Sequence, residues 1–137
     1  MTILADFVVV EGDETHLIGD QLFVWNATFK TDNVHATGSA MLMLMVRGLT
    51  QATQDVDVQL NGTRVGTIFR HTGADQEHWY TQIINIGSGI LRDTNANPQL
   101  PNELTLEAVP IMGGGGSGNN FDGFRVRDII CFFQQEV

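Results

Sequence analysis

Hydrophobic and polar residues alternate along several short stretches of this chain, as they do in strands that bury one face. In the clearest stretch, Val56, Val58 and Leu60 alternate with polar neighbours, and Asn61-Gly62 follows directly. Asn-Gly adopts the positive φ angles of a tight two-residue turn. The pattern therefore predicts a β-hairpin whose three apolar side chains face a core.

Short apolar or β-branched runs of this kind recur along the whole chain, separated by Gly, Asn, Asp and Pro at the roughly 8–12-residue spacing typical of sandwiches and barrels. The runs cover residues 3–10, 21–30, 39–47, 55–60, 63–69, 79–86, 103–109 and 124–133. We therefore predict an all-β fold, an eight-stranded antiparallel β-sandwich with jelly-roll topology. A length of 137 residues suits a single domain spanning 1–137.

Alternation also predicts the inward side chains of two later strands. Leu104 and Leu106 should face the core, whereas Arg125 and Arg127 should face outward. The segment 40–46, AMLMLMV, is apolar at every position instead. We predict a central strand covered on both sides, by a second sheet and by either a long loop or another subunit. The subunit alternative leads us to expect a homo-oligomer.

The charge balance excludes two classes of partner. Sixteen acidic residues stand against seven basic ones, for a formal net charge of -9. Binding to nucleic acid or to an anionic membrane depends on clustered Lys and Arg, and here these residues are scattered. Neutral ligands or cations remain as candidate partners.

The single cysteine and the start of the chain bear on the cellular setting. Cys131 lies in the apolar run IICFF, so we expect a buried thiol without an internal disulfide partner. The segment MTILADFVVVEGDE lacks the basic start and long apolar stretch of a secretion signal. We expect a protein that is cytoplasmic or released without a classical signal peptide.

The loop RHTGADQEHWY carries the residue types that bind sugars. An aromatic ring stacks on the apolar face of a sugar, while acidic and basic groups bind its hydroxyls. Candidate ligand-binding residues here are Arg70, His71, Asp75, Glu77 and Trp79. The alternative is that Trp79 is the first core residue of its strand and that the charges are simply solvated.

Metal coordination is a further reading of the same loop. His71, Asp75, Glu77 and His78 match neither a helical zinc pair nor the His-x-His cluster of metal-binding jelly-roll enzymes, and the remaining histidines lie in other loops. The metal-binding residues are therefore left unassigned by the sequence.

Two other segments offer polar groups. SGNNFDG contains Asn119, Asn120 and Asp122, whose oxygens suit sugar hydroxyls or calcium, although such residues beside Gly also form ordinary turns. The segment 84–103 reads as a long crossover between sheets, from which Asp93 and Asn95 could face the same rim.

The sequence shows no arrangement typical of an enzyme. It has no Gly-x-Ser-x-Gly elbow, no phosphate-binding loop and no Cys-x-x-Cys pair. We therefore expect no catalytic residues and no required cofactor, with calcium as an optional ion.

The series AMLMLMVRGL, DVDVQLNGTRVGTI, LPNELTLEAV and FRVRDIICFFQ resembles the galactose-binding-domain-like jelly roll, over residues 39–134. That resemblance implies a carbohydrate-binding module or lectin that binds through loops at one end of the sandwich, sometimes with calcium. It implies Trp79 as the aromatic platform, with Asn119, Asn120 and Asp122 on the rim. AVPIMGGGGSGNNFDGF is also similar to the binding loop of soluble bacterial calcium-dependent galactose lectins, but Ala108 stands where that family has Asp.

The leading hypothesis from the sequence is a non-enzymatic, lectin-like module for a neutral glycan. The main alternative is a structural or assembly protein, such as a phage, virion or particle component, without a small-molecule ligand. A small metal-dependent enzyme is a third reading.

Overall fold

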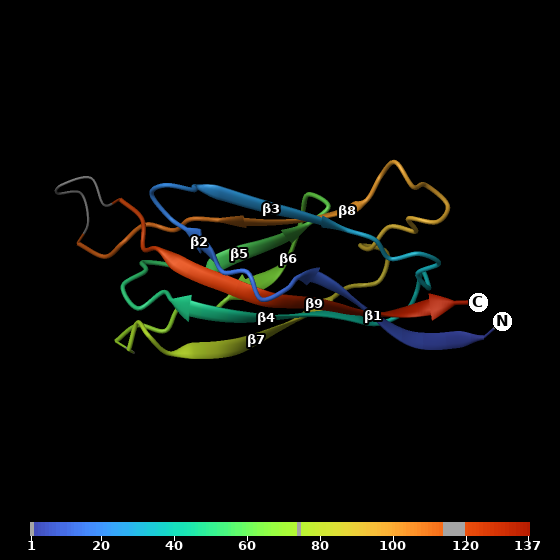
Figure 1. The fold of residues 1–137 in the computed structure, drawn as a ribbon, viewed down its shortest axis with the longest axis horizontal. Helices are drawn as coiled ribbons and strands as arrows, with labels where there is room; N and C mark the ends of the chain where they lie inside the picture. Colours follow the sequence, from blue (N-terminus) through green and yellow to red (C-terminus); the bar gives the residue numbers. More distant parts are fainter. Residues whose placement is uncertain (1, 74, 114–119) are drawn as a thin grey trace.

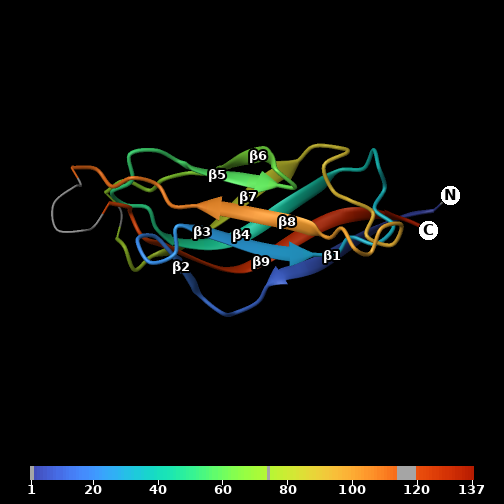
Figure 2. The same cartoon turned by 90° about the horizontal axis from the view of Figure 1, so that it is seen from above.

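The computed structural model describes residues 2–73, 75–113 and 120–137, and it shows two antiparallel sheets stacked face to face (Figures 1 and 2). Their strands are β1 Ile3–Glu11, β2 His16–Ile18, β3 Val24–Phe29, β4 Ala40–Gly48, β5 Val56–Leu60, β6 Thr63–Ile68, β7 Trp79–Ile86, β8 Asn102–Glu107 and β9 Phe124–Glu136. The described residues include no helix that could span a membrane. The predicted all-β sandwich is confirmed.

The strand order is that of a jelly roll. One sheet has the order β1-β9-β4-β7, with β2 also paired to β9, and the other has the order β3-β8-β5-β6. The pairs β5 with β6, β4 with β7, β3 with β8 and β1 with β9 are nested around the Asn61-Gly62 turn. The whole chain is therefore one long hairpin that is wound over itself.

All eight predicted strands are present, and β2 is a ninth that the sequence did not reveal. Three residues are too few to show a repeating alternation of side chains. The strand is identified by its pairing with β9, in which His16 lies opposite Val126. It continues the line of β1 along the same edge of the sheet.

The hairpin and the inward side chains follow the predicted pattern. Asn61 and Gly62 have φ angles of 55° and 81°, as the tight turn requires. Leu60, Leu104 and Leu106 are fully buried between the sheets. At the β6–β7 edge the sheets approach closely, since a Cβ on Gly66 would lie 2.7 Å from Cγ2 of Ile84. Glycine is needed there for the edges to meet.

A bulge at Asp128 reverses the alternation in the middle of β9. Arg125 and Arg127 face outward as predicted, but Asp128 has a φ of 51° and the register with β4 shifts beside it. After the shift Ile129 and Cys131 are fully buried. An extra residue in one strand changes the face of every residue that follows.

Strand β4 is central, as predicted, and only one of its faces is covered within a single chain. Leu42, Leu44 and Val46 are fully buried between the sheets. Met41 and Met43 project to the other side, where no layer of the described residues lies over them. The second cover that we expected from a loop or a subunit is therefore not supplied by the described part of the chain.

A buried amide joins four chain segments at the end of the sandwich that holds the termini. The Asn102 side chain donates to Oγ1 of Thr31 at 2.8 Å and accepts from the Arg92 N–H at 2.8 Å and from Nδ2 of Asn61 at 3.0 Å. Asn102 and Thr31 are fully buried. Polar groups at this depth depend on one another for hydrogen bonds.

Replacing Asn102 with Ala should destabilise the fold strongly, because it leaves buried donors and acceptors unpaired. We expect a loss of about 3 kcal/mol in the free energy of unfolding, measured by urea denaturation. The exposed Asn97→Ala is the matched control, with an expected change below about 0.5 kcal/mol. Equal effects of the two substitutions would contradict this role for Asn102.

Candidate functional site

Four loops meet at the end of the sandwich opposite the termini (Figure 1). They are the described parts of residues 19–23, 49–55, 69–78 and 108–123. Each strand crosses the sandwich once, so loops that are separated by one strand lie at opposite ends. The described parts of the two loops in which the sequence suggested a site, 70–80 and 117–123, therefore share one end, which we call the loop end.

The expectation that Asp93 and Asn95 share this rim is wrong. They lie in the β7–β8 connection, which is at the other end because β7 runs away from the loop end. There Asp93 accepts the Asn33 backbone N–H at 2.9 Å, which holds the pKa of its carboxyl below the ordinary 3.8. Asp93 thus serves to join two connections and takes no part in the candidate site.

Arg70 and His71 fasten the 69–78 loop to the neighbouring 49–55 loop. The Arg70 backbone N–H donates to Oδ1 of Asp55 at 2.9 Å, and its guanidinium donates to the Thr53 carbonyl. The His71 backbone N–H donates to the Leu49 carbonyl at 2.8 Å. The exposed His71 ring is therefore held on a fixed backbone.

An aromatic cluster forms around His71. Its ring centroid lies 5.0 Å from that of Tyr80, edge to face, and 6.4 Å from that of His78. Tyr80 is half-buried, and its hydroxyl donates to the Phe69 carbonyl at 3.3 Å. The sequence interpretation missed Tyr80, although alternation along β7 puts it on the opposite face from Trp79.

Asp75 and Glu77 lie in the same loop and are both exposed. Oδ1 of Asp75 accepts the Glu77 backbone N–H at 2.9 Å, which shapes the turn. Oε2 of Glu77 lies 3.1 Å from a guanidinium nitrogen of Arg47 on β4. Both acids therefore have a contact within the chain.

Trp79 lies on the outer face of the five-stranded sheet. The Arg127 guanidinium carbon lies 4.5 Å from the centroid of the indole, and that of Arg47 lies 5.2 Å from it. Guanidinium groups in this position are attracted to the ring. Trp79 is thus half-buried under arginines, and the structure does not bring it together with Tyr80.

The 108–123 loop contributes a buried acid and an exposed amide. Asp122 is buried, and its Oδ2 accepts the Gln51 backbone N–H at 2.9 Å. The Asn120 backbone N–H donates to Oδ1 of Asp20 at 3.0 Å. Asn119 lies outside the described residues. Asp122 therefore fastens this loop to the 49–55 loop, and Asn120 is the exposed member.

The electrostatics of the loop end are set by burial. Burial raises the pKa of the Asp122 carboxyl above its ordinary 3.8, and the hydrogen bond from Gln51 opposes the rise only in part. Burial, together with the nearby Asp122 and Asp55, raises the pKa of Tyr80 to about 12. The Tyr80 hydroxyl therefore stays protonated well above neutral pH, and it donates to the Phe69 carbonyl.

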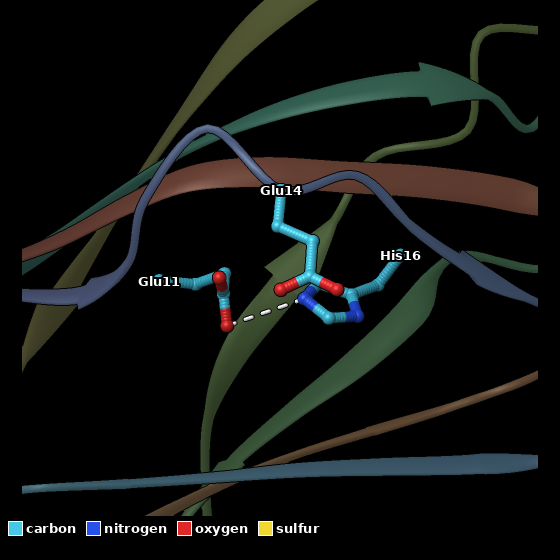
Figure 3. Close-up of side chains that lie close together, drawn as sticks. All are labelled: Glu11, Glu14 and His16. Carbon is cyan, nitrogen blue, oxygen red and sulfur yellow. Dashed lines mark ion pairs between the residues drawn. The ribbon is translucent and has the colours of Figure 1, made fainter.

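A second group of chemically active side chains lies at the β1–β2 junction (Figure 3). Glu11, Glu14 and His16 have ligating atoms within 4.8 Å of one another, and Nε2 of His16 lies 3.2 Å from Oε2 of Glu11. Carboxylate oxygens and an imidazole nitrogen could together hold a divalent cation. The sequence interpretation did not select His16 as a candidate ligand. The spacing Glu-x-x-Glu-x-His is the feature of the sequence that could have identified this group.

Cys131 has the environment of a structural residue. The thiol is fully buried between the sheets, as predicted, and burial raises its pKa to about 12. Since the thiolate is the nucleophilic form, burial and the raised pKa both disfavour a nucleophilic role for Cys131.

The comparisons with known proteins give a likeness of fold. No family model matches the chain, and no curated protein matches it. The structure is similar to that of dimeric latent PorU from Porphyromonas gingivalis, with a TM-score of 0.56 and 11% identity over 99% of this chain. The chain spans only 13% of the PorU chain.

Carbohydrate-binding modules are also among the similar structures, as the resemblance of the sequence led us to expect. A family 29 module from Piromyces equi has a TM-score of 0.45 and 12% identity, covering 94% of this chain and 91% of that chain. A family 35 module from Clostridium thermocellum has a TM-score of 0.42 and 14% identity, covering 88% and 97%. A likeness at this level does not extend to a ligand.

Asp122 should make stability depend on pH. Its raised pKa means that the folded protein favours the protonated carboxyl, so its ionisation lowers the free energy of unfolding as the pH rises above 3.8. Asp122→Asn keeps an acceptor for the Gln51 N–H and removes the ionisation. Relative to the wild type, this variant should gain stability between a pH near 3.8 and neutral pH.

Urea denaturation near pH 3.8 and at neutral pH measures the free energy of unfolding of Asp122→Asn and of the wild type. The exposed Asp13→Asn is the control. A stability difference between Asp122→Asn and the wild type that stays constant, or falls with rising pH, would show that burial does not control this carboxyl.

Proposed function

We propose that this chain is a non-enzymatic binding module that recognises a neutral carbohydrate through its loop end. The observation that carries the proposal is the convergence there of an exposed aromatic ring with charged and amide side chains from three loops. His71 and Tyr80 supply aromatic surface, and Arg70, Asn120 and Gln51 supply exposed polar groups at the same end of the sandwich. Sugars present both an apolar C–H face and hydroxyls, which these two kinds of group match.

The roles of the individual residues follow from their contacts. Arg70 and His71 have fixed backbones and exposed side chains, so they can contact a ligand without losing much backbone conformational entropy. Asp122 and Asp55 hold the loops in place. Asp75 and Glu77 are rim acceptors, and Trp79, which belongs to the other face, lies outside the contact surface of this proposal.

His71→Ala should weaken glycan binding by about tenfold or more, because it removes the exposed ring of the aromatic cluster. The ligand is first found by a glycan array with and without calcium, and affinity is then measured by calorimetry. Thr28→Ala is the control, because Thr28 lies on the outer face of the four-stranded sheet, and it should leave the affinity unchanged. Calcium dependence would favour the resemblance to calcium-dependent lectins.

Three results would count against the proposal. One is an array without any bound glycan in either condition. Another is a glycan whose affinity is unaffected by His71→Ala but lost with Trp79→Ala, which would move the site to the outer face of the five-stranded sheet. The third is an equal loss of affinity in Thr28→Ala, which would indicate a site on the opposite sheet.

A structural or assembly role is the second candidate function. It is favoured by the apolar outer face of the five-stranded sheet, where Met41, Phe7 and Ile83 are exposed. Light scattering after size-exclusion chromatography distinguishes the two: particles of many copies that bind no glycan would favour assembly.

A further inference from the structure

The outer face of the five-stranded sheet carries two adjacent rows of apolar side chains. In one row Phe7 lies opposite Phe132, which lies opposite Met41. In the next, Val9, Ile130, Met43 and Ile83 lie side by side across four strands. Because the pairs are direct cross-strand neighbours, the side chains form one continuous patch, which we call the apolar face.

Several side chains of the apolar face are exposed to solvent in the single chain. Ile83 is 60% exposed, Phe7 59% and Val9 54%. Single exposed apolar residues are common on protein surfaces, but a continuous patch of this kind marks an interaction site. Met41 and Met43 add long, adaptable side chains that can fit a partner surface.

The opposite surface of the sandwich has a different character. On the outer face of the four-stranded sheet, Oγ1 of Thr105 donates to Oδ1 of Asn26 at 2.8 Å, and Asp57 and Arg64 form an ion pair at 2.9 Å. An antiparallel sheet normally has one solvated face, and this sheet follows that rule. The outer face of the five-stranded sheet is apolar instead, as in a sheet whose second face is covered by another layer.

Charge is distributed unevenly along the apolar face. Arg47 and Arg125 lie directly opposite each other at the loop end, with Arg127 beside them. These are three of the seven basic residues of a chain with a net charge of -9. At the other end of the same face, Glu136 lies opposite Ile3 and is exposed, and its Oε1 lies 2.9 Å from Nδ1 of His35. Glu77 pairs with Arg47 and Asp128 pairs with Arg127, each at 3.1 Å, so in the described part of the chain Arg125 is the arginine of this group without an acidic partner. The face therefore has Arg125 at one end, an apolar middle and the carboxylate of Glu136 at the other end.

We propose that a second copy of this chain covers the apolar face, with its strands running antiparallel to those of the first copy. A two-fold axis in the plane of the interface can lie along the strands or across them. An axis along the strands would place the basic ends against each other. An axis across the strands places Arg47 and Arg125 of each copy near Glu136 of the other, and like charges then stay apart.

The size of the face fits such a dimer. Four strands about 4.8 Å apart and about nine residues long, at about 3.4 Å per residue, give a flat footprint of about 600 Å². Side chains that stand out from the sheet add to this area, so it approaches the roughly 800 Å² per partner of a standard interface. Two sheets packed in this way lie about 10 Å apart.

Sedimentation velocity over a range of concentrations tests the dimer, and Ile83→Glu tests the face. The wild type should sediment at twice the 15.1 kDa of one chain, and Ile83→Glu should raise the dissociation constant by about tenfold or more. Since Ile83 is exposed, this variant should retain the fold, which circular dichroism checks. Thr28→Glu adds the same charge on the other sheet and should leave the dimer intact.

A charge exchange tests the orientation. Arg125→Glu alone should weaken the dimer at low salt, and adding Glu136→Arg should restore part of the lost affinity, because positions 125 and 136 again carry opposite charges across the interface while Arg47 keeps its Glu77 partner. Failure of the double variant to recover would overturn the antiparallel arrangement.

The proposal as a whole is overturned by a wild type that stays monomeric up to about 100 µM. It is equally overturned by a species larger than a dimer, or by equal effects of Ile83→Glu and Thr28→Glu. None of these outcomes bears on glycan binding at the loop end, so the two proposals can fail separately.

Discussion

The hydrogen bond from the Asn61 side chain to the Asn102 side chain is the interaction on which the rest of this fold depends. Asn61 forms the turn about which the chain doubles, and its side chain reaches Asn102 at the start of β8 and the Ile90 carbonyl in the long crossover. Asn102 extends the contacts to Thr31 after β3. The turn at the centre of the nested strand pairs is thus joined to two other strands of the four-stranded sheet and to the connection that arrives from β7 in the five-stranded sheet.

The fold was predictable from the sequence where a local rule determines it. Asn61-Gly62 and the alternation of β5 and β8 predicted a hairpin and two inward faces correctly, because both depend on neighbouring residues alone. The bulge at Asp128 was not predictable, since an Asp in an otherwise regular strand is compatible with an unbroken alternation. That one residue puts Ile130 and Phe132 on the outer face, where they complete the apolar rows.

The candidate site, too, was predictable only where it depends on neighbouring residues or on the order of the strands. The order of the strands along the chain puts the β6–β7 and β8–β9 connections at the same end, so the loop end was predictable. The side chains that gather around each residue were not predictable, because these contacts come from strands distant in the sequence. On the outer face Arg127 from β9 lies 4.5 Å from the Trp79 ring centroid, while Tyr80 and the buried Asp122 face the space between the sheets.

The geometry of the proposed dimer changes what a glycan-binding loop end would do. With antiparallel strands, the loop ends of the two copies lie at opposite ends of the dimer and point away from each other. Two such sites cannot readily bind neighbouring sugars on one flat surface, which is the usual source of increased affinity in multivalent binding. They can bind sugars on two separate molecules or surfaces, so the dimer would act as a bridge between glycans.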